Sequence, residues 1–176
     1  PGAEPHAIGG YAAALLLDGD ALLARPGLRA TEEAFRRWLR AAALVRTGPA
    51  GGAVVVVASA AAPAVQALVR WDPAGLAARE LSDRATSGFP PVARAIELTG
   101  ATADVTELLG LTDLPEEAQI LGPVPARTEG HDQVILRSPR PAASKLTAAV
   151  KAAQGIRAAR RSGGPVRVRV DPVDLG

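Results

Sequence analysis

The 176-residue sequence predicts two successive units, an α/β unit followed by a smaller α+β unit. In the first half, short apolar runs alternate with stretches that have apolar residues at helical spacing, the pattern of a parallel α/β sheet. The Gly-Phe-Pro-Pro sequence at residues 88–91 then breaks the pattern of regular secondary structure. Beyond it, segments with two-residue alternation surround a long amphipathic stretch. We place the boundary between residues 78 and 79, just before this interruption.

The first unit reads as strand, helix, strand, helix. Residues 11–17 form an apolar run that Asp18-Gly19-Asp20 ends, as expected for a strand buried on both faces and closed by a turn. Residues 29–46 carry apolar side chains at helical spacing. Residues 53–58, with four consecutive valines, predict a second buried strand, and residues 63–69 predict a short helix.

The second unit begins after a polar helical connector at residues 76–87. Its elements are expected as strands at 92–98, 133–137 and 166–170, and as helices at 104–109 and 141–161, with a turn at 122–125. The apolar stripe of the long helix is expected to be Leu146, Ala149, Val150, Ala153 and Ile156. In the last strand, alternation directs the valines to one face and Arg167 and Arg169 to the other.

Composition limits the class of protein. Hydrophobic residues make up 48% of the chain, which predicts a folded protein rather than a disordered one. The absence of cysteine excludes disulfides and thiolate metal sites within this sequence. No apolar run reaches the roughly 18 to 20 residues that a membrane helix needs, so we expect no membrane association and a cytoplasmic protein. The opening Pro1-Gly2-Ala3-Glu4-Pro5, without an initiator Met, suggests a fragment.

Charge is distributed unevenly along the chain. Residues 1–82 carry eight basic and seven acidic side chains, whereas residues 83–132 carry three basic and nine acidic ones. Residues 133–176 carry nine basic and two acidic side chains. Such an excess predicts an anionic partner, and nucleic acid is the partner we expect. The candidate DNA-binding residues are Arg137, Arg140, Lys145, Lys151, Arg157, Arg160, Arg161, Arg167 and Arg169.

Some of these cations have a simpler explanation. Arg157, Arg160 and Arg161 lie in the last turn of the long helix, where positive charge offsets the negative end of the helix dipole. The alternative, a solvated basic face without a ligand, stays open for the rest. The second unit has Phe89 as its single aromatic residue, so contacts to phosphates would have to dominate over base stacking.

The sequence contains no motif that indicates catalysis. Neither lysine follows a glycine, so no phosphate-binding loop is present. Asp18 and Asp20 suit either a solvated turn or a site that holds a metal ion, and the turn is the interpretation we favour. His6 and His131 lack companions at ligand spacing. We therefore expect no catalytic residue, no metal ligand and no cofactor within this sequence.

Four strings occur in a fixed order along the chain. They are Glu80-Leu81-Ser82-Asp83-Arg84, Gly88-Phe89-Pro90-Pro91, Leu121-Gly122-Pro123-Val124-Pro125-Ala126 and Val168-Arg169-Val170-Asp171-Pro172. In this order and spacing, the set resembles the C-terminal end of the PriA family of replication-restart proteins, also called primosomal protein N′. Each string alone is weak, but the ordered set is specific.

The resemblance implies a fold and a function for each unit. Residues 1–78 would be the α/β end of the second helicase lobe, and residues 79–176 the small C-terminal α+β DNA-binding domain. The family recognises abandoned or stalled replication forks and helps to assemble the primosome. The implied partners are forked or single-stranded DNA, single-strand-binding protein and other primosome proteins. Zinc and ATP would be bound by the family's upstream part.

Two departures from the family pattern bear on mechanism. Helicase-active members carry Gln-x-x-Gly-Arg-x-Gly-Arg, but here residues 41–48 read Ala-Ala-Ala-Leu-Val-Arg-Thr-Gly, and Arg46 is displaced. Because such arginines contribute strongly to phosphoryl transfer, we expect no helicase activity. The loop at residues 127–132 also lacks the family's basic residues. Two alternatives remain: a docking module for the acidic tail of single-strand-binding protein, and an active ATP-dependent 3′-5′ DNA helicase.

Overall fold

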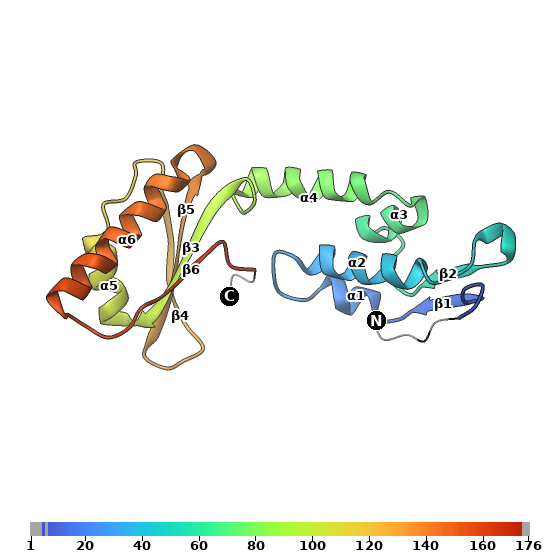
Figure 1. Cartoon of the computed structure of the whole chain (residues 1–176), viewed down its shortest axis with the longest axis horizontal. Helices are drawn as coiled ribbons and strands as arrows, with labels where there is room; N and C mark the ends of the chain where they lie inside the picture. The colour runs from blue at the N-terminus through green and yellow to red at the C-terminus, as the bar shows by residue number, and fades with distance from the viewer. Residues whose placement is uncertain (1–4, 6, 174–176) are drawn as a thin grey trace. The chain divides into compact units, whose positions relative to one another are not determined.

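The structure is a computed structural model that describes residue 5 and residues 7–173 (Figure 1). His6 lies outside the described residues. In chain order, the elements are β1 (Ala13–Leu16), α1 (Gly19–Leu23), α2 (Ala30–Ala42), η1 (Gly48–Ala50), β2 (Ala53–Val56), α3 (Pro63–Arg70), α4 (Pro73–Ser87), β3 (Ala93–Ala101), α5 (Thr102–Leu111), β4 (Gln119–Pro125), β5 (His131–Pro139), η2 (Arg140–Ala142), α6 (Ala143–Arg160) and β6 (Arg167–Val170).

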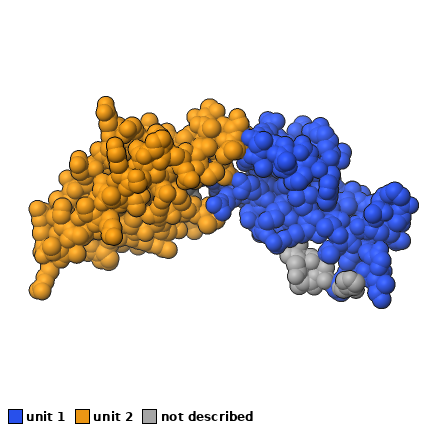
Figure 2. Space-filling view, turned by 45° about the horizontal axis from the view of Figure 1, so that its top comes forward, with its two compact units in different colours: residues 1–80, 176 blue, residues 81–175 orange. Residues whose placement is uncertain are grey.

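The chain divides into two compact units (Figure 2). The first ends at Glu80 and the second begins at Leu81, so the division falls inside α4 and slightly beyond the boundary expected from the sequence. None of the helices among the described residues is long and apolar enough to span a bilayer.

The first unit contains a two-stranded parallel sheet, as the alternating pattern predicts. β1 pairs with β2 in register from Ala13 opposite Ala53 to Leu16 opposite Val56. Leu16 and Val56 pack against a core of α2 and α3 side chains. The expectation that both strands are buried on both faces is wrong for this chain. Leu15 is 61% exposed and Val55 is 53% exposed, because the helices cover only one face of the sheet.

Asp18 is the N-cap of α1, which begins at Gly19, so this segment opens a short helix and both carboxylates are exposed to solvent, as a solvated turn predicts. The backbone amide of Ser59 donates a hydrogen bond to Oδ1 of Asp20 at 2.8 Å, which ties this segment to the chain after β2. A Cβ at Gly19 would lie 2.6 Å from that of Ala58, so the position admits only glycine. The described residues contain no cluster of His, Cys, Asp or Glu side chains able to hold a metal ion.

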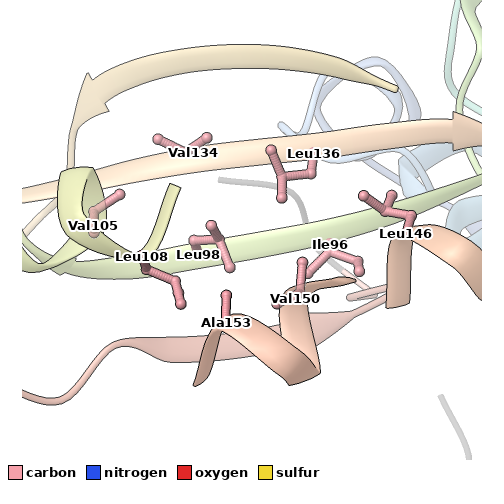
Figure 3. Close-up of a cluster of buried hydrophobic side chains, with 9 residues drawn as sticks. All are labelled: Ile96, Leu98, Val105, Leu108, Val134, Leu136, Leu146, Val150 and Ala153. Atoms are coloured by element: carbon pink, nitrogen blue, oxygen red, sulfur yellow. The ribbon is translucent and has the colours of Figure 1, made fainter. Parts of the chain in front are cut away.

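The second unit is a four-stranded antiparallel sheet with two helices on one face (Figure 1). The strand order is β4-β5-β3-β6, so β3 and β5 lie in the middle. α5 and α6 cover the face that carries Ile96, Leu98, Val134 and Leu136 (Figure 3). The buried cluster consists of Ile96, Leu98, Val105, Leu108, Val134, Leu136, Leu146, Val150 and Ala153.

Strand β4 occupies a segment where the sequence predicts only a turn. The expected turn at residues 122–125 is instead a bulge within β4, where the register against β5 shifts between Leu121 and Val124. Gly122 has φ 103°, a left-handed value that glycine adopts without strain, and its bond to Pro123 is cis. Glycine and proline thus bend the strand here without ending it.

Helix α6 follows the predicted apolar stripe except at its end. Leu146, Val150 and Ala153 are buried as expected. Ile156 is 40% exposed, and the next buried position is taken by Arg157. The spacing from Ala153 explains the difference: residue 157 lies four positions on and continues the buried stripe, whereas residue 156 is rotated toward the solvent.

Leu146, which is buried, and Ile156, which is exposed, make a matched test of the core. Leu146→Ala should lower the free energy of unfolding by about 2–5 kcal/mol, since it leaves a cavity beneath the sheet. Ile156→Ala should lower it by less than about 1 kcal/mol. Chemical denaturation of both variants checks this difference, and equal losses would contradict the assignment of Ile156 to the surface.

Candidate nucleic-acid interface

The sheet of the second unit has one face without helices, which we call the open face. Residues directly opposite each other on neighbouring strands point to the same face. Arg167 stands opposite Thr99, Arg169 opposite Glu97, and Arg137 opposite Ala95. These positions alternate with the core residues of β3 and β5, so all three arginines lie on the open face. Two strands that are distant in sequence, β5 and β6, thus place cations on one surface.

Arg169 is neutralised on this surface by Glu97. Its Nη2 donates to Oε2 of Glu97 at 2.6 Å and its Nε donates to Oε1 at 3.1 Å. Glu97 is only 3% exposed, so its carboxylate depends on this partner. The sequence predicts that both arginines make this strand face cationic, and this is corrected for Arg169. Its positive charge is largely neutralised by Glu97 within the protein.

Arg167 differs from Arg169 in having no partner among the described residues. It is exposed, and within the described part of the chain no side chain or backbone group bonds to its guanidinium. Its opposite residue, Thr99, is uncharged and donates its hydroxyl hydrogen bond to Glu97. The charge of Arg167 is therefore available to an external anion.

Arg137 is held at the other end of the open face. Its Nε donates to Oε1 of Gln119 at 2.8 Å, and its Nη1 donates to the carbonyl oxygen of Ser87 at 2.6 Å. Its guanidinium also lies over the ring of Phe89, 5.6 Å from the ring centre. The single aromatic ring of the unit is thus covered by an arginine, which agrees with an interface that does not rely on base stacking.

Other candidate cations lie on the helical layer, on the opposite side of the sheet. Arg140 and Lys151 line a hollow of about 620 Å³ together with Arg94. Lys145 borders a neighbouring hollow that also contains Glu116 and Glu117. Arg160 and Arg161 are exposed at the C-terminal end of α6. The nine residues proposed from the sequence therefore do not form one surface.

Arg157 is buried and fully engaged. Its Nε donates to Oε2 of Glu107 and its Nη2 to Oδ1 of Asp104, both at 2.8 Å. Nη2 also reaches the carbonyl oxygen of Gly164, and the amide of Gly164 donates to Asp104. Because the side chain is only 8% exposed, it has no access to a phosphate. We withdraw Arg157 from the candidate interface.

The Arg157 cluster fixes the loop that leads into β6. The hydroxyl of Ser162 donates to Oε1 of Glu107 at 2.7 Å, next to the bonds around Gly164. The far end of β6 is fixed by Asp171, whose backbone amide and carboxylate bond both to Ala95 on β3. An ion pair of 3.3 Å joins Asp171 to Arg94. Arg167 and Arg169 are therefore displayed on a strand anchored at both ends.

Sequence reasoning missed the acidic partners that define this surface. The position of Glu97 could have indicated a paired arginine, because a single carboxylate in an otherwise apolar strand requires a counter-charge when it is buried. Asp104 and Glu107 gave no comparable signal, since acids are ordinary in the first turns of a helix. Their pairing with Arg157 depends on how two helices distant in sequence pack together.

This architecture defines a class: a small two-layer α/β domain whose open sheet face carries cations. The family model described as "Primosomal protein N C-terminal domain" matches residues 85–173. The "Probable replication restart protein PriA" of Mycobacterium leprae (strain TN) is 46% identical over 187 residues, which cover 100% of this chain and 29% of the relative. Its counterpart in Mycobacterium tuberculosis (strain CDC 1551 / Oshkosh) is 44% identical over 194 residues, covering 100% and 30%.

The chain therefore belongs to the PriA family of replication restart proteins, as the ordered strings indicate. It spans about three tenths of the length of these relatives and corresponds to their C-terminal part. The family model begins at residue 85 and covers nearly all of the second unit.

Removing Arg157 should destabilise the second unit. Arg157→Met leaves the carboxylates of Asp104 and Glu107 without their counter-charge, so the free energy of unfolding should fall by about 3–5 kcal/mol. Arg160→Met, an exposed neighbour on the same helix, should change it by less than about 0.5 kcal/mol. Urea denaturation measures the free energy of unfolding of both variants. Equal losses in the two variants would show that the buried cluster does not contribute to stability.

The same cluster predicts a dependence on pH. Hydrogen bonds from Ser162 and Arg157 lower the pKa of Glu107 below its ordinary value. A carboxyl whose pKa is lower in the folded than in the unfolded state stabilises the fold fully at pH values above its unfolded pKa of about 4.3. This stabilisation is lost as the pH falls through the pKa of the folded state. Glu107→Gln should therefore weaken the fall of stability with acid, as followed by urea denaturation at a series of pH values. Exposed Glu116→Gln is the control, and an unchanged acid dependence in Glu107→Gln would contradict this role.

Proposed function

We propose that this chain binds DNA in replication restart, through the open face of its second unit. The observation that carries the proposal is Arg167, an exposed and unpartnered cation on a strand anchored at both ends. Arg137 lies on the same face, toward its other end, where Gln119 and Ser87 hold its guanidinium. Phosphate contacts of this kind supply the sequence-independent part of DNA affinity.

Forked or single-stranded DNA is the proposed ligand, with recognition of stalled or abandoned forks as the role. The relatives are named as replication restart proteins, and the matching family model is a primosomal one, so DNA and other primosome proteins are the partners this membership favours. The low aromatic content of the second unit supports binding through the backbone of DNA and not through stacked bases.

We further propose that the first unit is the end of a helicase-like lobe that does not hydrolyse ATP. Leu15 and Val55 are exposed on the uncovered face of its parallel sheet, as expected for a face that further elements of a larger lobe would cover. At residues 41–48, α2 ends, and the amide of Arg46 donates to the carbonyl oxygen of Tyr11. The segment thus joins the sheet region while lacking the family's arginine spacing.

A substitution at Arg167 tests the DNA-binding surface. Arg167→Ala should weaken binding to fork DNA and reduce the magnitude of the slope of log affinity against log salt by about one, the value for one lost phosphate contact. Fluorescence anisotropy at several salt concentrations measures both. Arg127→Ala, in an exposed loop that lacks the family's basic pattern, is the control and should leave the slope unchanged. An unchanged slope in Arg167→Ala would exclude this strand.

A second candidate function is docking of the acidic tail of single-strand-binding protein. A hollow on the helical layer favours it, because Arg140 and Lys151 are exposed on its rim and make no ion pair among the described residues, whereas its third cation, Arg94, is paired with Asp171. Two unpaired cations beside a concave surface suit a short acidic peptide.

The two functions separate by substitution. Arg140→Glu combined with Lys151→Glu should abolish binding of an acidic tail peptide by charge repulsion, while the salt slope of DNA binding stays as in the wild type. Calorimetry with the peptide and anisotropy with DNA give the two readouts. Loss of DNA binding in this double variant would place the DNA surface on the helical layer instead.

A further inference from the structure

A hollow of about 370 Å³ lies beside Arg137, at the end of the open face. Its walls come from the last turn of α4, the start of β4 and the ends of β3 and β5, all within the second unit. The lining combines apolar surface with polar groups that could orient a small ligand. The polar lining residues are Thr86, Ser87, Glu117, Gln119, Arg137 and Ser138.

Arg137 is fixed in this hollow but is not saturated. Gln119, Ser87 and Phe89 each hold part of its guanidinium. A Cβ at Gly88, which has φ 65°, would lie 3.3 Å from Nη1, so a glycine lets the backbone approach it closely. Nη2 has no acceptor among the described residues. Arg137 is the open-face arginine that combines a fixed orientation with unused donors, because Glu97 occupies Arg169 and nothing orients Arg167.

The surroundings of Arg137 disfavour an anionic ligand. Glu117 lines the same hollow, has no ion-pair partner in the described chain, and makes no salt bridge to Arg137. The C-terminal end of α4 adds the partial negative charge of its carbonyl groups. A phosphate oxygen placed here would meet a carboxylate as well as a guanidinium. A neutral ligand that both accepts and donates hydrogen bonds suits this combination better.

An unpaired nucleobase has this chemistry. A guanidinium presents neighbouring N–H donors to adjacent acceptors, and a carboxylate accepts from an exocyclic amino group. Cytosine carries the acceptors and the amino group on one edge, where the amino group stands beside two acceptors. Thymine has no amino group and would leave Glu117 unmatched.

We propose that this hollow binds an unpaired cytosine of single-stranded DNA, with Arg137 and Glu117 as the residues that determine specificity. The proposal rests on the proposed DNA-binding function and adds a base-reading site to it. Backbone contacts around Arg167 would position the strand, and the hollow would read one base displaced from the stack.

Three single-stranded probes of equal length test the site: oligodeoxycytidine, oligodeoxythymidine and an abasic strand, each at neutral pH. The wild type should bind the cytidine strand severalfold more tightly than the thymidine strand. Arg137→Lys keeps the charge but loses the planar fork, so it should weaken cytidine binding about tenfold, the range for one lost bidentate base contact. Its affinity for the abasic strand and its salt slope should not change.

The controls separate this proposal from the one it rests on. Arg127→Lys makes the same chemical change in an exposed loop and should affect no probe. Glu117→Gln retains the fold at an exposed position and should reduce the preference for cytidine over thymidine. Equal losses on all three probes in Arg137→Lys, or no loss on any, would overturn the base site while leaving DNA binding in place. Absence of binding to every probe by the wild type would instead overturn the DNA-binding function.

Discussion

Strand β3 is bonded along both edges, to β5 and to β6, and helices cover only one of its faces. The rest of the second unit depends on this constraint. Ile96 and Leu98 must point toward α5 and α6, so Glu97 and Thr99 must point away. Because pairing transmits the same alternation to both neighbours, Arg137, Arg167 and Arg169 are directed to the open face. A slip of one residue would bury these arginines and expose the core.

The arginines of this unit show how burial and pairing decide which charges can act outside the protein. Arg157 is buried and paired twice, so its role is to hold the loop before β6. Arg169 is half-buried and matched by Glu97, which limits its charge on the surface. Arg167 is exposed and unmatched within the described chain. A count of basic residues treats these positions alike, although removing each would have a different physical effect.

Local pattern predicted much of the fold. Two-residue alternation identified β6, and helical spacing identified the buried residues of α6 as far as Ala153. The prediction failed at Arg157, which continues the helical spacing of the stripe but carries a charge. Its burial is possible because Asp104 and Glu107 of α5 supply carboxylate partners, which no local pattern reveals. The candidate site was predictable as a list of cations, but its division between the open face and the helical layer was not. That division follows from strand order, which no local pattern contains.

The most direct measurement of the central claim is a titration of the isotope-labelled chain with single-stranded DNA, followed through its backbone amide resonances. Our account predicts that the largest shifts fall on residues of β6 and the adjoining parts of β3 and β5, around Thr99, Arg137 and Arg167, while the exposed side of α6 changes little. The largest shifts at Arg140 to Lys151 on the helical layer, with β6 unaffected, would contradict it.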